Sequence, residues 1–244
     1  MVKYHVLTLI KDLGFTKSVI NPVLFETDIG LVLFDAGYPK QIKDFESEFL
    51  RLGFSIKELA VIVLSHHDHD HIGSLNDLLA INRKIQIWAN EIEANYISGK
   101  NKSLRLLQAE EYNKTLSDNE KIFGEQFVDY LKTIDTVPVD KLIKNNEYIC
   151  TGIKVVNTPG HTPGHISLYL EEDKILFVGD ALAIEDNKLV IANPQFTLDM
   201  SETVESIKKI MKMNVSKMIC YHGNEYVGNV TNSLNELLKN LPNN

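Results

Sequence analysis

Four histidines and two aspartates fill six consecutive positions, residues 66–71, directly after an apolar run at 59–65. The run, LAVIVLS, is typical of a short strand that is buried on both faces of a sheet. Sheets in α/β proteins place their ligands at the carboxyl ends of such strands. The sequence therefore predicts a sheet-based fold with a polar site at the end of this strand.

Two sets of candidate ligands alternate along the cluster, because neighbouring side chains on an extended chain face opposite sides. The even register presents His66, Asp68 and Asp70, and the odd register presents His67, His69 and His71. A shift of one residue would exchange every candidate. If the chain turns into a helix after Asp70, His71 also reaches the even side. The spacing alone leaves both registers open.

The flanking segments predict strands and helices in two similar halves. Apolar runs at 4–10, 21–28 and 30–37 indicate an antiparallel meander, and 38–54 and 199–214 have apolar residues at helical spacing. Strands are expected again before residue 180 and at 216–223. We find no linker, so we expect a single domain spanning residues 1–244.

A polar, helix-prone insert occupies residues 91 to about 135. Its apolar residues leave one face that needs a partner. This face packs on the body of the protein or forms a lid over a site, since long inserts in compact domains are often functional. The sequence leaves both alternatives open.

Three further residues that can bind metal stand where strands meet loops. His161 lies in a turn rich in glycine and proline, Asp180 follows the strand LFVGD, and His222 follows the strand ICYH. A sheet holds ligands rigidly at such junctions. These positions favour a metal site built by both halves of the chain.

The ordered set of motifs resembles the metallo-β-lactamase superfamily, whose pattern is His-x-His-x-Asp-His, a later Gly-His-Thr turn, an aspartate and a final histidine. The segment FDAG at 34–37 resembles the family's strand-end Asp-x-Gly. The resemblance implies an α/β (α+β) fold: a four-layered αβ/βα sandwich of two mixed β-sheets flanked by helices.

The resemblance also implies the ligands of two metal ions. It assigns His66, Asp68 and His161 to the first ion, Asp70, His71 and His222 to the second, and Asp180 to a bridge between them. Asp68 departs from the family pattern, which has histidine there; the flavo-diiron branch has a glutamate. His67 and His69 would then face away from the metals, and Asp35 and His165 would support the ligands.

The aspartate at position 68 changes the expected charge of the centre. Two divalent ions and three aspartates leave one positive charge for a bridging hydroxide to neutralise. A histidine at 68 would make the centre one unit more positive. Zinc is the expected metal, and Asp68 favours the harder ions Mn²⁺ or Fe²⁺ more than an all-histidine site would.

By resemblance, the expected function is a dinuclear metal-dependent hydrolase of a small molecule. A hydroxide bridging the metals attacks an ester, lactone or thioester, with Asp70 and Asp180 as the catalytic carboxylates. The alternatives are a di-iron oxidoreductase-type centre related to the flavo-diiron branch, a phosphodiesterase, or a non-catalytic metal-dependent binding module.

Composition narrows the partners and the compartment. A net charge of −8 argues against a nucleic-acid surface, which needs clustered Lys and Arg. We recognise no export signal and no membrane span, so we expect a cytoplasmic protein whose two cysteines are reduced. A homodimer is a further expectation, since dimers are common among proteins of this size. Cys220 is a candidate ligand or a core residue, and the candidate proton donors are Tyr38, Tyr112, Tyr221 and Tyr226.

Overall fold

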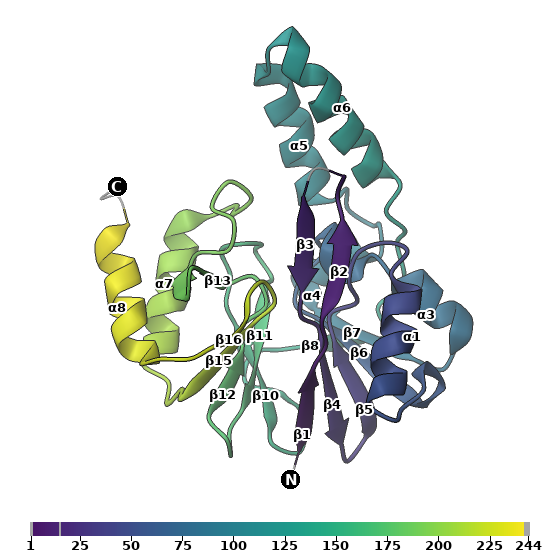
Figure 1. The fold of residues 1–244 in the computed structure, drawn as a ribbon, viewed down its shortest axis with the longest axis vertical. Coiled ribbons are helices and arrows are strands. Elements are labelled where there is room, and N and C mark those ends of the chain that lie inside the picture. The colour runs from purple at the N-terminus through teal and green to yellow at the C-terminus, as the bar shows by residue number, and fades with distance from the viewer. Residues whose placement is uncertain (1, 15, 242–244) are drawn as a thin grey trace.

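Two six-stranded sheets lie face to face in the computed structural model, which describes residues 2–14 and 16–241 (Figure 1). The first sheet consists of β1 (Lys3–Val6), β4 (Val23–Thr27), β5 (Gly30–Phe34), β6 (Leu59–Leu64), β7 (Gln86–Asn90) and β8 (Lys141–Ile143), in that order. The second consists of β16 (Asn224–Tyr226), β15 (Lys217–Cys220), β12 (Ile175–Phe177), β11 (Ile166–Leu170), β10 (Ile153–Asn157) and β9 (Tyr148–Cys150).

Helices cover the outer face of each sheet. α1 (Ile42–Arg51) and α3 (Leu75–Ile81) pack on the first sheet, and α7 (Met200–Met211) and α8 (Val230–Asn240) pack on the second (Figure 1). One apolar core lies between each sheet and its helices, and a third fills the space between the two sheets. The expected four-layered sandwich is therefore confirmed.

Strand β5 shows why these strands are apolar throughout. Leu31 and Leu33 belong to the core beneath the helices, whereas Val32 and Phe34 belong to the core between the sheets. Both faces of the strand are covered, as the continuous apolar runs predict. Both sheets are mixed: in the first, β4 pairs antiparallel with β1 and β5, whereas β5, β6, β7 and β8 are parallel.

Two short hairpins differ from the sequence expectation. Residues 4–10 do not form one strand, because the chain leaves the sheet after β1 and pairs β2 (Leu9–Asp12) with β3 (Lys17–Ile20). A second hairpin, β13 (Ala183–Glu185) and β14 (Lys188–Val190), was not predicted. Asp186 and Asn187 form its two-residue turn with positive φ, a conformation that Asp and Asn adopt more readily than most residues.

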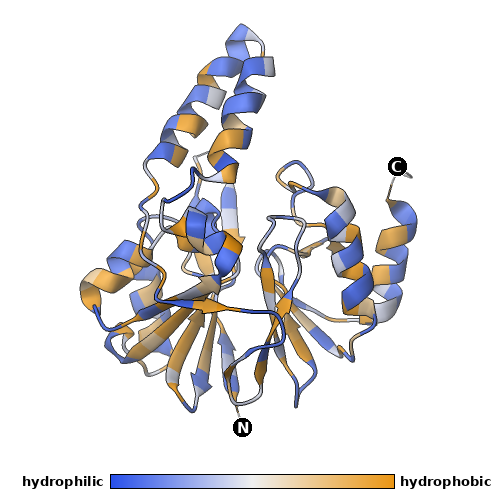
Figure 2. Cartoon of the chain, turned by 180° about the vertical axis from the view of Figure 1, so that it is seen from behind, coloured by the Kyte–Doolittle hydropathy of each residue, from blue (hydrophilic) through white to orange (hydrophobic). Residues whose placement is uncertain are grey.

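The predicted insert is helical and projects from the body of the protein (Figure 1). It contains α4 (Glu91–Ile97), α5 (Leu104–Thr115) and α6 (Asp118–Lys132). Helices α5 and α6 form an antiparallel hairpin whose contact face is small: Leu106, Ala109, Phe127, Val128, Tyr130 and Leu131. The far part of the hairpin is mostly hydrophilic, but it also carries exposed apolar residues such as Phe123 (Figure 2). Only the base of the hairpin rests on the body.

Candidate metal centre

Asp35 organises the loop that carries the cluster. It follows β5, and its φ of 68° is unusual for a residue other than glycine. Its Oδ1 accepts a hydrogen bond from the amide of Ser65 at 2.8 Å, and its Oδ2 lies 2.9 Å from Nδ1 of His71. This contact leaves Nε2 of His71 facing the site. Asp35 therefore orients a predicted ligand, as the sequence indicates.

The even register is the one that the structure adopts. After the extended residues that follow β6, helix α2 (His69–Ile72) begins before Asp70, earlier than expected, and turns His71 to the side of His66. The two ring centroids are 4.0 Å apart. The chain therefore brings four members of the cluster to one side: His66, Asp68, Asp70 and His71.

All seven predicted ligands converge at the edge of the two sheets. Nε2 of His161 lies 3.1 Å from Oδ2 of Asp68, and Nε2 of His222 lies 3.3 Å from Oδ2 of Asp70. Three groups of side chains offer ligand atoms within 4.8 Å of one another: His66, Asp68 and His161; Asp70, His71 and His222; and His66, His71 and Asp180. The first two groups match the two sets that the resemblance implies.

Asp180 lies between the two sets. One of its oxygens, Oδ2, is 3.6 Å from Nε2 of His161 and 3.6 Å from Nε2 of His222. Its backbone amide donates to Nε2 of His165 at 3.0 Å, so His165 supports the aspartate. Gly179 makes this contact possible, because a Cβ there would lie 2.8 Å from the same Nε2.

The charges of the site are strongly coupled. Burial would raise the pKa of Asp180, but His222 and His71 hold it well below its usual value. Burial would lower the pKa of His222, yet Asp180 and Asp70 raise it to about 10. Carboxylates and imidazoles therefore compensate one another at close range, which is an arrangement suited to binding a cation.

Five buried atoms of the predicted ligands form no hydrogen bond within the described part of the chain: His66 Nε2, Asp68 Oδ1, His71 Nε2, His161 Nδ1 and Asp180 Oδ1. Buried polar atoms in folded proteins almost always have a partner. These atoms are imidazole nitrogens and carboxylate oxygens, the donors that divalent zinc, manganese and iron accept. The residues present therefore fit a metal centre.

His67 faces away from this centre, as predicted, but solvent does not reach it. Its Nδ1 contacts Oε2 of the buried Glu93, and its ring stacks on Tyr96 at 4.5 Å. The other oxygen of Glu93 accepts from Thr162 Oγ1 and from the amide of Gly164, both at 2.8 Å. Glu93 thus joins the cluster loop to the loop of His161. His69 also faces away, toward the rings of Tyr38, Phe127 and Tyr130.

Arg105, which the sequence analysis missed, reaches the centre from the base of the hairpin. It is only 2% exposed, and its Nε and Nη2 donate to Oδ2 of Asp68 at 3.0 and 2.5 Å. Nη2 also lies 3.3 Å from Nε2 of His161. The charge balance expected from the sequence is therefore incomplete, because a guanidinium adds one positive charge beside Asp68.

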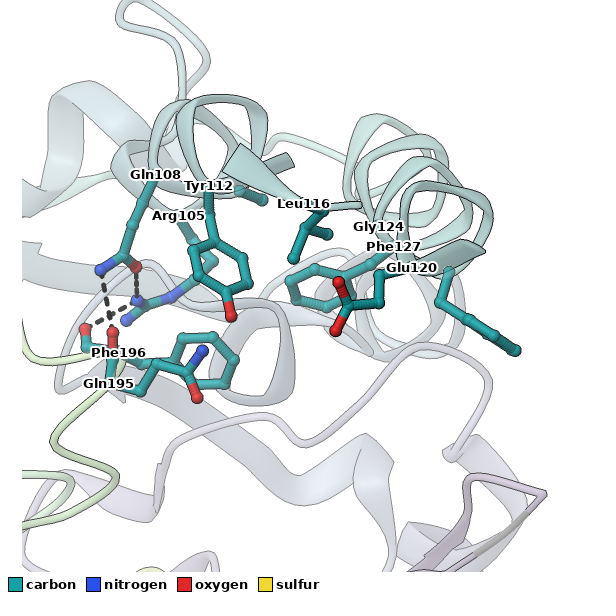
Figure 3. Close-up of a pocket in the computed structure, with 11 residues that line it drawn as sticks. Arg105, Gln108, Tyr112, Leu116, Glu120, Gly124, Phe127, Gln195 and Phe196 are labelled. Carbon is teal, nitrogen blue, oxygen red and sulfur yellow. Dashed lines mark hydrogen bonds between the residues drawn. The ribbon is translucent and has the colours of Figure 1, made fainter. Parts of the chain in front are cut away.

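An apolar cavity of 560 Å³ adjoins Arg105 between the two hairpin helices and the loop at 193–197 (Figure 3). Phe127 and Phe196 line it with stacked rings whose centroids are 6.2 Å apart, and Tyr112, Leu116 and Phe123 are further members of its wall. Gln108 and Arg105 close one end through hydrogen bonds to backbone carbonyls of Gln195 and Phe196. One side chain, Arg105, thus separates the cavity from Asp68.

The remaining candidates have other partners. Cys220 is buried in the core beneath α7 and α8 and belongs to none of the three groups. The hydroxyl of Tyr221 donates to the backbone carbonyl of Asp70, that of Tyr226 bonds to Ser233, and that of Tyr38 bonds to Ser18. Tyr112 lines the apolar cavity.

Comparison with known proteins agrees with this geometry. The chain is 27% identical over 252 residues to the probable metallo-hydrolase YflN of Bacillus subtilis (strain 168), covering 93% of this chain and 90% of that protein. It is 26% identical over 230 residues to an N-acyl homoserine lactonase of a Bacillus species, covering 83% and 79%.

A solved structure shares the fold. The metallo-beta-lactamase family protein TTHA1429 from Thermus thermophilus superposes with a TM-score of 0.74 at 20% identity, covering 96% of this chain and 77% of that one. No described helix is long and apolar enough to cross a membrane. A model of the metallo-beta-lactamase superfamily matches residues 16–222, and the chain therefore belongs to this superfamily.

Proposed function

We propose that the chain is a dinuclear metal-dependent hydrolase that cleaves an ester, lactone or thioester of a small molecule. The observation that carries this proposal is the position of Asp180, whose Oδ2 lies at the same 3.6 Å from a histidine of each ligand set. Divalent ions bound there would acidify water and polarise a carbonyl oxygen. Zinc fits the donor set, and manganese or iron fits its carboxylates.

The residues of the chain supply the remaining parts of the reaction. Asp70 and Asp180 are ionised at neutral pH, since neighbouring histidines hold their pKa values low against the effect of burial. Both carboxylates are therefore charged and would hold divalent ions, whose effect on bound water supplies the nucleophile. His222 is the most exposed of the paired ligands, with 30% of its side chain accessible, so substrate and water reach the centre on its side.

The apolar cavity supports a substrate that carries an apolar group. Pockets of several hundred Å³ with mostly apolar walls and a few polar groups commonly bind small molecules. This cavity has such walls and ends at Arg105, which contacts Asp68 and His161. An acyl chain could lie along the apolar wall that Phe127 and Phe196 form, next to the side of Arg105 that faces away from Asp68. The name of the lactonase relative is consistent with this class.

The test combines metal analysis with a substrate screen. Protein purified without added metal is analysed for zinc, manganese and iron, and is then assayed with esters, lactones and thioesters of short and long acyl chains. We expect about two ions per chain. Asp180→Ala should lose bound metal and turnover together, whereas Asp173→Ala, at an exposed position, should keep both. Full activity in Asp180→Ala would refute the proposal.

A further inference from the structure

The contact between Asp68 and Arg105 connects a predicted metal ligand to the helical hairpin. Nε and Nη2 of the guanidinium both donate to one carboxylate oxygen, Oδ2. Nη1 donates to the carbonyl of Phe196 at 2.6 Å and to the side chain of Gln108. The guanidinium also lies over the ring of Phe196, 4.7 Å from its centroid. Arg105 is thus held on every side.

Burial explains why the two charges must stay together. Asp68 is 4% exposed and Arg105 is 2% exposed. Transfer of either charge from water to such a site without a partner is strongly unfavourable, and the loss of one partner leaves the other uncompensated. Asp68 thus has a permanent cation of its own before any metal ion binds.

Oδ2 of Asp68 is shared between the guanidinium and the ligand group. Arg105 donates to it, and Nε2 of His66 and Nε2 of His161 lie 3.4 and 3.1 Å from it. Oδ1 is buried and forms no hydrogen bond within the described residues. The other members of this ligand group, His66 and His161, are imidazoles. A carboxylate that is paired with a guanidinium has no net charge, as a neutral imidazole has none.

We propose that Asp68 and Arg105 act as one charge-neutral unit in the first ligand group, which makes Arg105 a positioning residue of the metal centre. Arg105 fixes the carboxylate through Oδ2 and cancels its charge. The unit then presents a carboxylate beside His66 and His161, whose Nε2 atoms lie 3.4 and 3.1 Å from Oδ2, with the net charge of a third histidine. The inference rests on the proposed metal centre, and it adds the hairpin as a part of that centre.

An exchange of charges tests the unit. Asp68→His alone leaves the guanidinium buried among imidazoles, where it repels a cation. We expect this variant to lose one ion per chain, with affinity lowered about 10–100-fold, the usual effect of losing a group that supports a ligand. The double variant Asp68→His with Arg105→Met removes the repelling charge and should regain the ion, as measured by elemental analysis and chelator competition.

A matched control replaces an arginine that also pairs with a carboxylate, but at the surface. Arg51 contacts Glu48 at 2.8 Å, and 55% of its side chain is exposed. Asp68→His combined with Arg51→Met should not regain the ion. Equal metal content in Asp68→His and in its Arg105→Met double variant would overturn the proposal.

A second measurement applies if Asp68→His does not fold. Asp68→Asn, Arg105→Met and their double variant are unfolded with urea in the presence of a chelator. We expect the double variant to have a higher midpoint than either single variant, and additive losses would contradict the unit. The urea experiment needs no bound metal, so its outcome tests only the unit. The proposed function is tested separately: wild-type protein that binds no metal and hydrolyses no substrate would refute it.

Discussion

Oδ2 of Asp35 lies 2.9 Å from Nδ1 of His71, and both side chains are fully buried. A hydrogen bond to Nδ1 fixes the ring and its tautomer, so that Nε2 is the nitrogen available to a metal. The strained backbone of Asp35 therefore has a role in the site, since it brings the carboxylate from the end of β5 to the cluster loop.

Replacement of this carboxylate should weaken metal binding without unfolding the chain. We expect Asp35→Asn to lower the affinity for metal about 10–100-fold, as measured by chelator competition. Asp140→Asn is the control, because Asp140 also accepts a backbone amide at 2.8 Å but belongs to none of the ligand groups. Equal losses in the two variants would show that Asp35 only stabilises the fold.

The contact of His67 with Glu93 should matter for stability. Glu93→Ala leaves three buried groups without their acceptor, namely Nδ1 of His67, Oγ1 of Thr162 and the amide of Gly164, at a cost of about 1–3 kcal/mol each. The substitution should therefore lower the free energy of unfolding in urea by at least about 3 kcal/mol. Glu91→Ala, exposed in the first turn of the same helix, should change it by less than about 0.5 kcal/mol.

Metal binding should release protons. Nearby carboxylates raise the pKa of His71 well above 6.5 and that of His222 to about 10, although burial opposes both shifts. At pH 7 both imidazoles of the metal-free protein are protonated, and they must lose these protons to bind metal. Affinity should therefore rise with pH until about pH 10. Calorimetry in buffers of different ionisation enthalpy measures the release, and heats that do not depend on the buffer would contradict it.

The same raised pKa values affect the metal-free protein in the opposite direction. A folded-state pKa above the unfolded value stabilises the folded chain fully below pH 6.5. That contribution is lost as pH rises toward 10. Alkaline solutions should thus lower the melting temperature of chelated protein while they favour the metal-bound form, and differential scanning fluorimetry with and without zinc compares the two trends.

The apolar cavity should select substrates by acyl length. Phe123 lines it, whereas its exposed neighbour Ile122 does not. We expect Phe123→Ala to raise KM for a long-chain ester roughly 10-fold, the effect of about 1.4 kcal/mol of lost apolar burial. A short-chain ester should be unaffected, as should both substrates with Ile122→Ala. The same rise for short and long chains would exclude the cavity as the acyl site.

Sequence patterns were sufficient to predict the parts of the site in which a residue able to bind metal directly follows an apolar strand. The buried run at 59–65 and the cluster after it predict the strand and its end, and comparison of the cluster with the family's His-x-His-x-Asp-His pattern adds the even register. Asp180 and His222 could be recognised because each follows an apolar strand. The layers follow from runs that are apolar on both faces. The roles of the seven ligands remain predictions.

Arg105 and Glu93 could not be found in this way. Both lie in a polar, helix-prone segment, where arginine and glutamate are ordinarily solvated and carry no signal of burial. Their importance arises only when α4 and α5 pack against the cluster loop, where their partners lie 26 and 37 residues away along the chain. The aspartate at position 68 was the available clue. It adds one negative charge where the family pattern has a histidine, and a buried carboxylate needs a cation as its partner.

The hairpin of α5 and α6 has two ends with different freedom to change during evolution. Its base carries Arg105 and the amide of Leu104, which donates to His67, so substitutions there disturb the reaction centre. Its tip contacts little beyond the hairpin itself and can be lengthened, shortened or given new side chains at low cost. Descendants of this chain can therefore acquire new substrate preferences while their hydrolytic chemistry is inherited intact.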